Sequence, residues 1–154
     1  KHANGTYIKI LPEDDVLPPD SLKHLLSAIK RDRADFVHGN AKVLKVVNGK
    51  SYTYHPKVIH PTLSDLLAHN HINGVATLYR KDLWDRYGGW DDALWTGEEY
   101  EWHLRLLHNA CKIAYVNETV VVFRIHPKGK SFRRSGDYFQ KRVKAIKEIR
   151  QKYR

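Results

Sequence analysis

The sequence predicts an α/β fold in which helices flank a mixed sheet, and three observations carry this prediction. Segments of strand character alternate with segments of helical periodicity along the 154 residues. The pair Asn48-Gly49 lies between two alternating segments, a pattern typical of a β-hairpin, so at least one strand pair is expected to be antiparallel. A hydrophobic content of 42% suits a folded domain rather than a disordered chain.

The strands are expected where a short apolar or alternating run stands beside a turn signal. They span residues 7–11, 36–38, 41–47, 50–54, 75–80, 112–116 and 119–125. Asn117-Glu118 is interpreted as a turn that separates the last two of them.

The helices are expected where apolar residues recur with a helical period. The first helix follows Pro18-Pro19-Asp20-Ser21, and its apolar positions are Leu22, Leu25, Leu26 and Ile29. Thr62 is expected to cap a second helix that runs to His69, and Gly88-Gly89 to stop a third over residues 82–87. A fourth helix begins after Thr96 or Gly97, and a fifth begins at Ser135 with one apolar face made of Phe139, Val143, Ile146, Ile149 and Tyr153.

Positive charge is concentrated at the C-terminus. The chain has 27 Lys and Arg against 17 Asp and Glu, a net charge of +10, and residues 128–154 alone carry +9. A local cationic face favours a phosphate-bearing partner such as a nucleotide, a nucleic acid or an anionic lipid. The alternative is a solvated helix face that has no partner.

Several classes of protein do not fit the sequence. No apolar run is long enough to span a membrane, and the charged N-terminus does not resemble a signal peptide. The single Cys111 excludes a disulfide framework and a cysteine-rich zinc site. Because the chain contains no Met and begins at Lys1, we expect a fragment trimmed at its N-terminus.

An acidic turn follows the first expected strand. Glu13, Asp14 and Asp15 stand just beyond its carboxyl end, where open α/β sheets bind their ligands. Adjacent carboxylates repel each other, and a hard cation such as Mg²⁺ or Mn²⁺ would neutralise them while it keeps positions for substrate phosphates. The alternative is that Asp14 and Asp15 merely form a turn and cap the following helix from just before its start.

A second acidic segment follows two glycines. Gly88-Gly89-Trp90-Asp91 leads to Gly97-Glu98-Glu99, and the two glutamates stand at the expected start of a helix. A carboxylate at this place can accept a proton from an acceptor hydroxyl. The alternative role is electrostatic capping of the helix.

A basic, glycine-containing segment follows the last expected strand. His126 ends that strand and can offer a nitrogen ligand to a metal, or serve a structural role only. Lys128, Lys130 and Arg133 come next, and such side chains can bind a diphosphate together with backbone amides.

Taken in order, these segments resemble the family 2 glycosyltransferases, which are inverting enzymes of the GT-A fold. The resemblance covers residues 4–131 and rests on Asn4-Gly5-Thr6-Tyr7-Ile8 with Leu11-Pro12-Glu13-Asp14-Asp15, on Gly88-Gly89-Trp90-Asp91, on Gly97-Glu98-Glu99, and on Arg124 with His126 and Ser131. It implies that residues 1–134 form a catalytic portion without the family's N-terminal nucleotide-base-binding segment. Residues 135–154 would form a basic amphipathic helix that packs on this domain or extends from it.

The resemblance also implies roles for single residues. Glu99 would be the catalytic base, supported by Glu98. Asp14, Asp15 and His126 would hold the metal. The nucleotide would contact Glu13, Asp14, Asp15, Lys128, Lys130 and Arg133, and the sugar or acceptor would contact Trp90, Asp91, Trp95 and Asn73. The chain departs from the family at Pro12, where an Asp is usual, and at Glu99, where the base is usually Asp.

The function implied is transfer of a hexose or N-acetylhexosamine from a nucleotide-diphospho-sugar, with a UDP-sugar favoured, to an acceptor hydroxyl. The acceptor would be a glycan, a lipid-linked molecule or a protein, the cofactor Mn²⁺ or Mg²⁺, and the location cytoplasmic or at the inner face of a membrane. One alternative is a nucleic-acid- or membrane-binding module built on the basic helix, although the acidic segments disfavour nucleic acid. Another is an inactive fragment of the glycosyltransferase fold.

Overall fold

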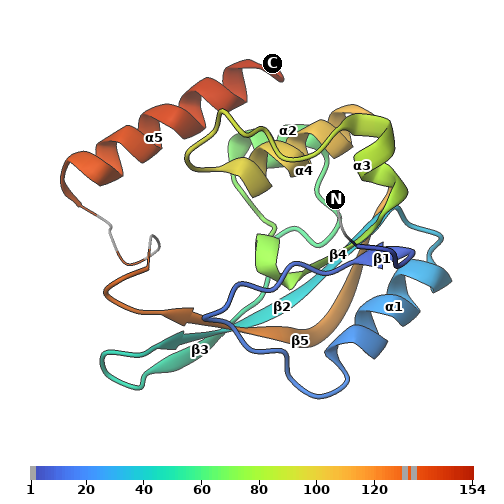
Figure 1. Cartoon of the computed structure of the whole chain (residues 1–154), viewed down its shortest axis with the longest axis horizontal. Coiled ribbons are helices and arrows are strands. Elements are labelled where there is room, and N and C mark those ends of the chain that lie inside the picture. Colours follow the sequence, from blue (N-terminus) through green and yellow to red (C-terminus); the bar gives the residue numbers. More distant parts are fainter. Residues whose placement is uncertain (1–2, 130–131, 133–134) are drawn as a thin grey trace.

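A computed structural model describes residues 3–129, 132 and 135–154, and it confirms the mixed α/β class (Figure 1). The elements follow one another as β1 (Tyr7–Ile8), α1 (Ser21–Arg31), β2 (Phe36–Lys45), β3 (Ser51–Tyr54), α2 (Leu63–Ala68), the 3-10 turn η1 (Gly74–Ala76), β4 (Thr77–Arg80), α3 (Asp82–Tyr87), α4 (Glu98–His108), β5 (Ile113–Ile125) and α5 (Gly136–Gln151).

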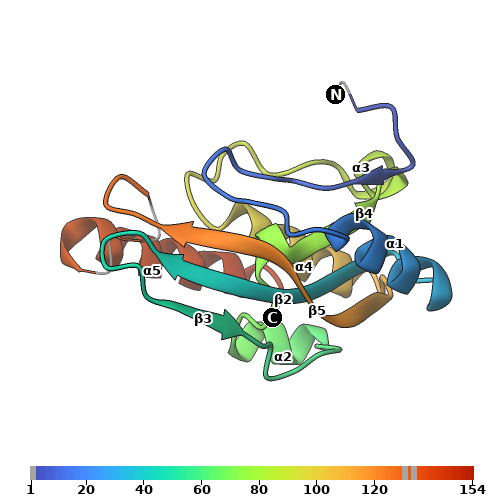
Figure 2. The ribbon, with the colours of Figure 1, turned by 90° about the horizontal axis from the view of Figure 1, so that it is seen from below.

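The sheet is built around β2. On one side β2 pairs in parallel with β5, and on the other it pairs antiparallel first with β4 and then with β3. Figure 2 shows β2 between β3 and β5. The short strand β1 pairs with β4, and Val16 forms an isolated bridge to Val122 of β5. This bridge brings the acidic turn that precedes Val16 to the far end of β5.

Helices cover both faces of the sheet. On one face α1 contributes Leu25, Ala28 and Ile29 to a buried cluster with apolar residues of β2, β4 and β5. On the other face α2, α3 and α4 bury a second cluster around Phe36, in which Trp102 is fully buried. Figure 1 shows α1 on the side of the strands opposite to these three helices.

The hairpin expected at Asn48-Gly49 is confirmed. Strands β2 and β3 pair from Ala41 opposite Tyr54 to Leu44 opposite Ser51, and Gly49 adopts a φ of 64° in the connecting loop. A positive φ favours glycine, which explains the local signal. The strands expected over 36–38 and 41–47 are one continuous strand, β2, which ends at Lys45, so that residues 46–47 belong to the turn.

The turn expected at Asn117-Glu118 is wrong, because β5 runs through both residues. The register shifts there: Gly39 pairs with Val116, but the next residue, Asn40, pairs with Thr119. The two extra residues therefore form a bulge rather than a chain reversal. Gly39 permits it, because a Cβ at this position would stand 2.9 Å from a methyl carbon of Val120.

Two other expected strands are shorter in the structure. Of residues 7–11 only Tyr7 and Ile8 are paired, and the strand expected over 75–80 begins as the 3-10 turn η1 before β4. Thr62 caps α2 in a reciprocal capping box with Asp65, and α3 ends at Gly88 with a φ of 77°.

The last helix, α5, packs against the start of α4. Gly97 has a φ of 79°, and a Cβ there would stand 2.7 Å from Ile146 Cδ1, so this glycine also lets the two helices approach. Ile149 of α5 is buried in the second cluster. Within the described residues, no helix has the length and apolar character needed to cross a membrane.

Candidate active site

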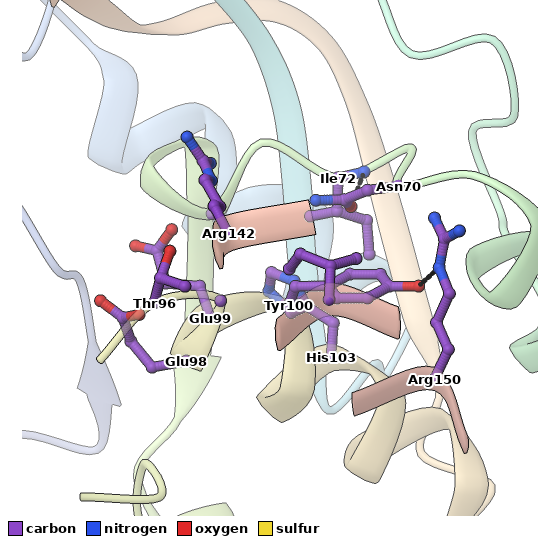
Figure 3. A pocket seen from close by; sticks show the side chains of 12 residues that line it. Asn70, Ile72, Thr96, Glu98, Glu99, Tyr100, His103, Arg142 and Arg150 are labelled. Atoms are coloured by element: carbon purple, nitrogen blue, oxygen red, sulfur yellow. Dashed lines mark hydrogen bonds between the residues drawn. The ribbon is translucent and has the colours of Figure 1, made fainter. Parts of the chain in front are cut away.

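A pocket of about 340 Å³ opens beside the N-terminus of α4 (Figure 3). Its walls come from the segment before β4, from the start of α4 and from one face of α5, and they include Gly74, Glu98, Glu99, Tyr100, Arg142 and Arg150. The helix start carries Glu98 and Glu99 in its first turn and has no side-chain cap of its own. The two glutamates expected at a helix start are therefore confirmed there and face a hollow in the surface.

Glu99 is a mostly buried carboxylate with an altered acidity. Its side chain lies against Gly74, because a Cβ at residue 74 would stand 2.5 Å from Glu99 Cδ. Burial, helped by the negative charge of Glu98, raises the pKa of Glu99 to about 7, while the charge of Lys9 acts in the opposite direction. A carboxylate with such a pKa can take up a proton near neutral pH.

Lys9 also belongs to this region, although it is part of none of the sequence motifs described above. Its Nζ donates hydrogen bonds to the carbonyl oxygens of Val75 and, at 3.3 Å, Ile10. Burial lowers the pKa of Lys9 to about 8, and the nearby charges of Glu99 and Asp15 act against that change. The available signal was a single lysine within the otherwise apolar segment 7–11.

Asp15 is held at the end of β5 and does not cap α1. It is only 7% exposed, and its Oδ1 accepts a hydrogen bond of 2.9 Å from the backbone N–H of Arg124. Its Oδ2 is buried and has no hydrogen-bond partner among the described residues. Burial raises the pKa of Asp15, and the bond from Arg124 opposes this rise. A buried oxygen without a partner is a natural place for a ligand.

Asp14 and His126, both expected at the metal, are in direct contact. His126 Nε2 lies 2.9 Å from Asp14 Oδ2, and the Arg124 guanidinium donates to the Asp14 carbonyl oxygen. The structure thus brings the acidic turn and the end of β5 together across more than a hundred residues of sequence. Glu13 and Lys128 are exposed beside them, and Lys130 and Arg133 lie outside the described residues.

The donor set fits a hard divalent cation only in part. Within residues 3–129, 132 and 135–154, no three His, Cys, Asp or Glu side chains gather as they would in a closed metal site. Mg²⁺ and similar ions commonly use one or two carboxylates and complete their shell with water and substrate phosphates. Asp15, whose Oδ2 has no partner, would supply one such carboxylate, and the neighbouring Asp14 would supply the second.

The four residues expected at the sugar or acceptor are spread over several places. Asn73 caps η1 through a bond from Val75 N, next to Gly74 and the pocket. Asp91 accepts a bond from Ala93 N and pairs at 3.3 Å with Lys152, which follows α5. Trp90 lines a separate hollow with Trp84, and Trp95 is 45% exposed with its ring against Tyr138. None of the four lines the pocket that holds Glu99, although Asn73 adjoins its lining residue Gly74.

His103, one of the residues that line the pocket, is paired with a buried tyrosine. His103 is fully buried, and its Nε2 lies 2.6 Å from the hydroxyl of Tyr79. Burial lowers the pKa of His103 to about 3, so this imidazole is neutral at physiological pH. It therefore acts as part of the core and not as a titrating group.

Comparisons with known proteins give one relative by sequence. No family model matches the chain. An uncharacterized glycosyltransferase from Haemophilus influenzae is 26% identical over 152 residues, which amount to 95% of this chain and 51% of that protein. The chain therefore spans about half the length of this relative.

Solved structures of S. aureus TarS share the fold. The TarS complex with UDP-GlcNAc superposes with a TM-score of 0.66 at 15% identity, over 96% of this chain and 43% of that one. The TarS complex with UDP gives a TM-score of 0.62 at 16% identity, over 96% of this chain and 41% of that one. The mixed α/β fold expected from the sequence is thus the fold of TarS, and the sequence is weakly similar to that of a glycosyltransferase.

Proposed function

We propose that this chain contributes the donor-phosphate and acceptor parts of a glycosyltransferase that moves a sugar from a nucleotide-diphospho-sugar to an acceptor hydroxyl. The observation that carries the proposal is Glu99, a mostly buried carboxylate with a pKa of about 7 in a pocket at a helix start. The shared fold with TarS, and the sequence similarity to an uncharacterized glycosyltransferase from Haemophilus influenzae, support it.

Glu99 is proposed as the general base. The acceptor oxygen would attack the anomeric carbon of the donor, the bond from that carbon to the diphosphate would break, and the hydroxyl proton would pass to Glu99. Attack from the face opposite the leaving group inverts the anomeric centre. The negative charge of Glu98 helps to raise the pKa of Glu99, which makes the carboxylate a stronger base.

The diphosphate is proposed to lie at the junction of the acidic turn and β5. Asp14 and Asp15 would hold Mn²⁺ or Mg²⁺ there, and the ion would neutralise the charge that builds on the leaving diphosphate. His126 would hold Asp14 in place, as it does in the structure at 2.9 Å. Lys9, whose charge acts on both Asp15 and Glu99, connects this donor side to the base.

A UDP-sugar is the donor that the comparisons favour, because TarS structures contain UDP and UDP-GlcNAc on the same fold. The acceptor would approach through the pocket beside Glu99, between α4 and α5. The TarS complex with UDP-GlcNAc also supports the proposal that the transferred sugar is a hexose or an N-acetylhexosamine.

Calorimetric titration with UDP tests the donor site. We expect binding that requires Mn²⁺ and is lost in Asp15→Ala, while Asp20→Ala, which removes an exposed aspartate from the start of α1, binds as the unchanged chain does. Binding that is indifferent to Mn²⁺ and to Asp15→Ala would contradict the assignment of the metal site. Absence of UDP binding with every divalent ion tested would reject a UDP-sugar donor for this chain.

A further inference from the structure

Two arginines of α5 line the same pocket as Glu99. In Figure 3 Arg142 and Arg150 lie on either side of Tyr100, while Glu98 and Glu99 extend from the start of α4. No Asp or Glu among the described residues forms an ion pair with either arginine, although both glutamates belong to the same pocket. The pocket thus contains two guanidinium groups that form no direct ion pair with a carboxylate of the described residues.

Arg150 is held in a fixed position. Its Nε donates a 3.0 Å hydrogen bond to the hydroxyl of Tyr100, which in turn donates to the carbonyl oxygen of Leu66. The guanidinium also lies 5.7 Å from the centre of the Tyr100 ring. Its terminal nitrogens have no acceptor among the described residues, so they remain available to a ligand.

Arg142 is half-buried and has no hydrogen bond to any described residue. A guanidinium that has lost part of its hydration without gaining a partner binds an oxyanion at a smaller desolvation cost than a fully exposed one. Arginine also presents paired N–H groups that match the oxygens of a phosphate. The two side chains therefore add positive charge to one side of the pocket, while Glu98 and Glu99 line the start of α4.

The pocket continues along α5. A second hollow of about 510 Å³ shares Arg142, Ile146 and Arg150 with it and adds Phe139, Val143, Lys147 and Arg154. Cationic and apolar side chains alternate along this face, and no carboxylate lines it. A ligand that reaches Glu99 by this route meets positive charge first.

We propose that Arg142 and Arg150 form a subsite for a phosphate group of the acceptor, which places a neighbouring hydroxyl of the same molecule at Glu99. The acceptor is then a phosphate ester of a polyol or of a lipid, and not a neutral glycan. This inference rests on the proposed function, because it assigns Glu99 to the acceptor hydroxyl.

The probe is sn-glycerol 3-phosphate, which carries a phosphate next to hydroxyls, with glycerol as the neutral comparison. The signals of the arginine Nε–H groups are followed by NMR at constant ionic strength. We expect saturable shifts at Arg142 and Arg150 with the phosphate ester and none with glycerol. Arg142→Gln and Arg150→Gln should each weaken binding roughly tenfold, since each removes charge-assisted bonds.

Lys144→Gln is the matched control. It removes one positive charge from the same helix at a side chain that is 79% exposed and outside both hollows. The proposed phosphate subsite would be contradicted if Lys144→Gln weakened binding of the phosphate ester as much as Arg142→Gln does. It would also be contradicted if glycerol bound as tightly as glycerol 3-phosphate. Because Arg150 contacts the core residue Tyr100, thermal unfolding of each variant is recorded, and Arg142→Gln decides the matter if Arg150→Gln does not fold.

Vesicles identify the source of the phosphate. A lipid-linked phosphate is supported if the protein sediments with phosphatidylglycerol vesicles and not with phosphatidylcholine vesicles. Arg142→Gln must then abolish this sedimentation. Binding of the soluble ester alone supports a polyol phosphate, and binding of neither overturns the proposal. The UDP titration is separate: if it fails while the phosphate ester still binds, the proposed function is wrong and the anion subsite stands.

Discussion

The carboxylate of Glu99 lies directly against the backbone of Gly74, the first residue of η1. A Cβ at residue 74 would stand 2.5 Å from Glu99 Cδ and 3.0 Å from Glu99 Cβ. This contact limits where the side chain of the proposed base can lie, while the first turn of α4 fixes its backbone. The glycine is thus required by the side chain it faces and not by a positive φ of its own.

Gly74→Ala is therefore expected to displace the Glu99 carboxylate. Sugar transfer should fall by roughly a hundredfold, because a shift of about one ångström at a reacting group costs that much. Gly5→Ala is the control, since its Cβ would meet only the Tyr7 carbonyl oxygen at 3.4 Å. Transfer rates and thermal unfolding are measured for both variants. Full activity in a folded Gly74→Ala protein would show that the position of Glu99 does not matter for transfer.

Lys9→Met tests the link between the buried lysine and the base. Removal of the positive charge makes ionisation of Glu99 harder, so its pKa should rise above the value of about 7. The active form of a base is the ionised one, and the acidic limb of the kcat/KM profile should therefore move to higher pH. Carboxyl ¹³C NMR of Glu99 gives the same pKa without catalysis.

Lys50→Met, an exposed lysine in the hairpin loop, serves as the comparison and should leave the profile in place. A Glu99 titration that is identical in Lys9→Met and in the unchanged chain would remove Lys9 from the site.

Stability should also report the altered acidity of Glu99. Its pKa rises from 4.5 to about 7 on folding, so the folded state binds more protons between these values and the free energy of unfolding falls as pH rises through this window. Glu99→Gln removes this effect. Below pH 4.5 the variant and the parent should be alike, and above pH 7 the variant should be more stable by at most about 3 kcal/mol.

Urea unfolding across pH 4 to 8 measures the difference. Glu98→Gln provides a second check. Loss of its negative charge should lower the pKa of Glu99 in the folded state, and the pH range over which the stability changes should become narrower. A stability difference that does not vary with pH would contradict the burial of an ionisable Glu99.

Local signals predicted the elements that local contacts determine. Asn48-Gly49 gave the hairpin because a φ of 64° at Gly49 is needed for the chain to reverse. Thr62 predicted the start of α2 because its capping box is formed with Asp65, only three residues along the chain. Neither feature needs information from elsewhere in the chain, so both could be read from a few consecutive residues.

The remainder depends on contacts between distant residues. Asn117 looks like a turn residue, but in the sheet its side chain bonds to Asn40, and Gly39 makes room for the bulge. The motif order placed Asp14 near His126, but only the folded chain shows that the lone lysine of segment 7–11 is buried beside Glu99 and Asp15. Arg142 lies in the basic C-terminal helix, where charge alone did not distinguish it from its neighbours.

Arg105 holds together the loop that carries Gly88-Gly89-Trp90. It forms an ion pair with Glu101, which is 3% exposed, and donates 2.9 Å hydrogen bonds to the carbonyl oxygens of Tyr87 and Gly89. Tyr153 near the C-terminus donates to the same glutamate. Arg105 thus links the end of α3, the following loop and α4, and Glu101 connects this group to Tyr153, which lies after α5.

Arg105→Ala leaves the Glu101 carboxylate buried without its cation, so we expect a loss of about 3 kcal/mol in the free energy of unfolding. Arg31→Ala is the comparison, because Arg31 is 66% exposed and its ion pair with Asp32 is screened by water and should contribute much less to stability. Urea unfolding at pH 7 measures both. Glu101→Gln combined with Arg105→Ala should recover part of the loss, since the uncompensated charge is then gone. Equal losses in Arg105→Ala and Arg31→Ala would show that burial of Glu101 does not strengthen this pair.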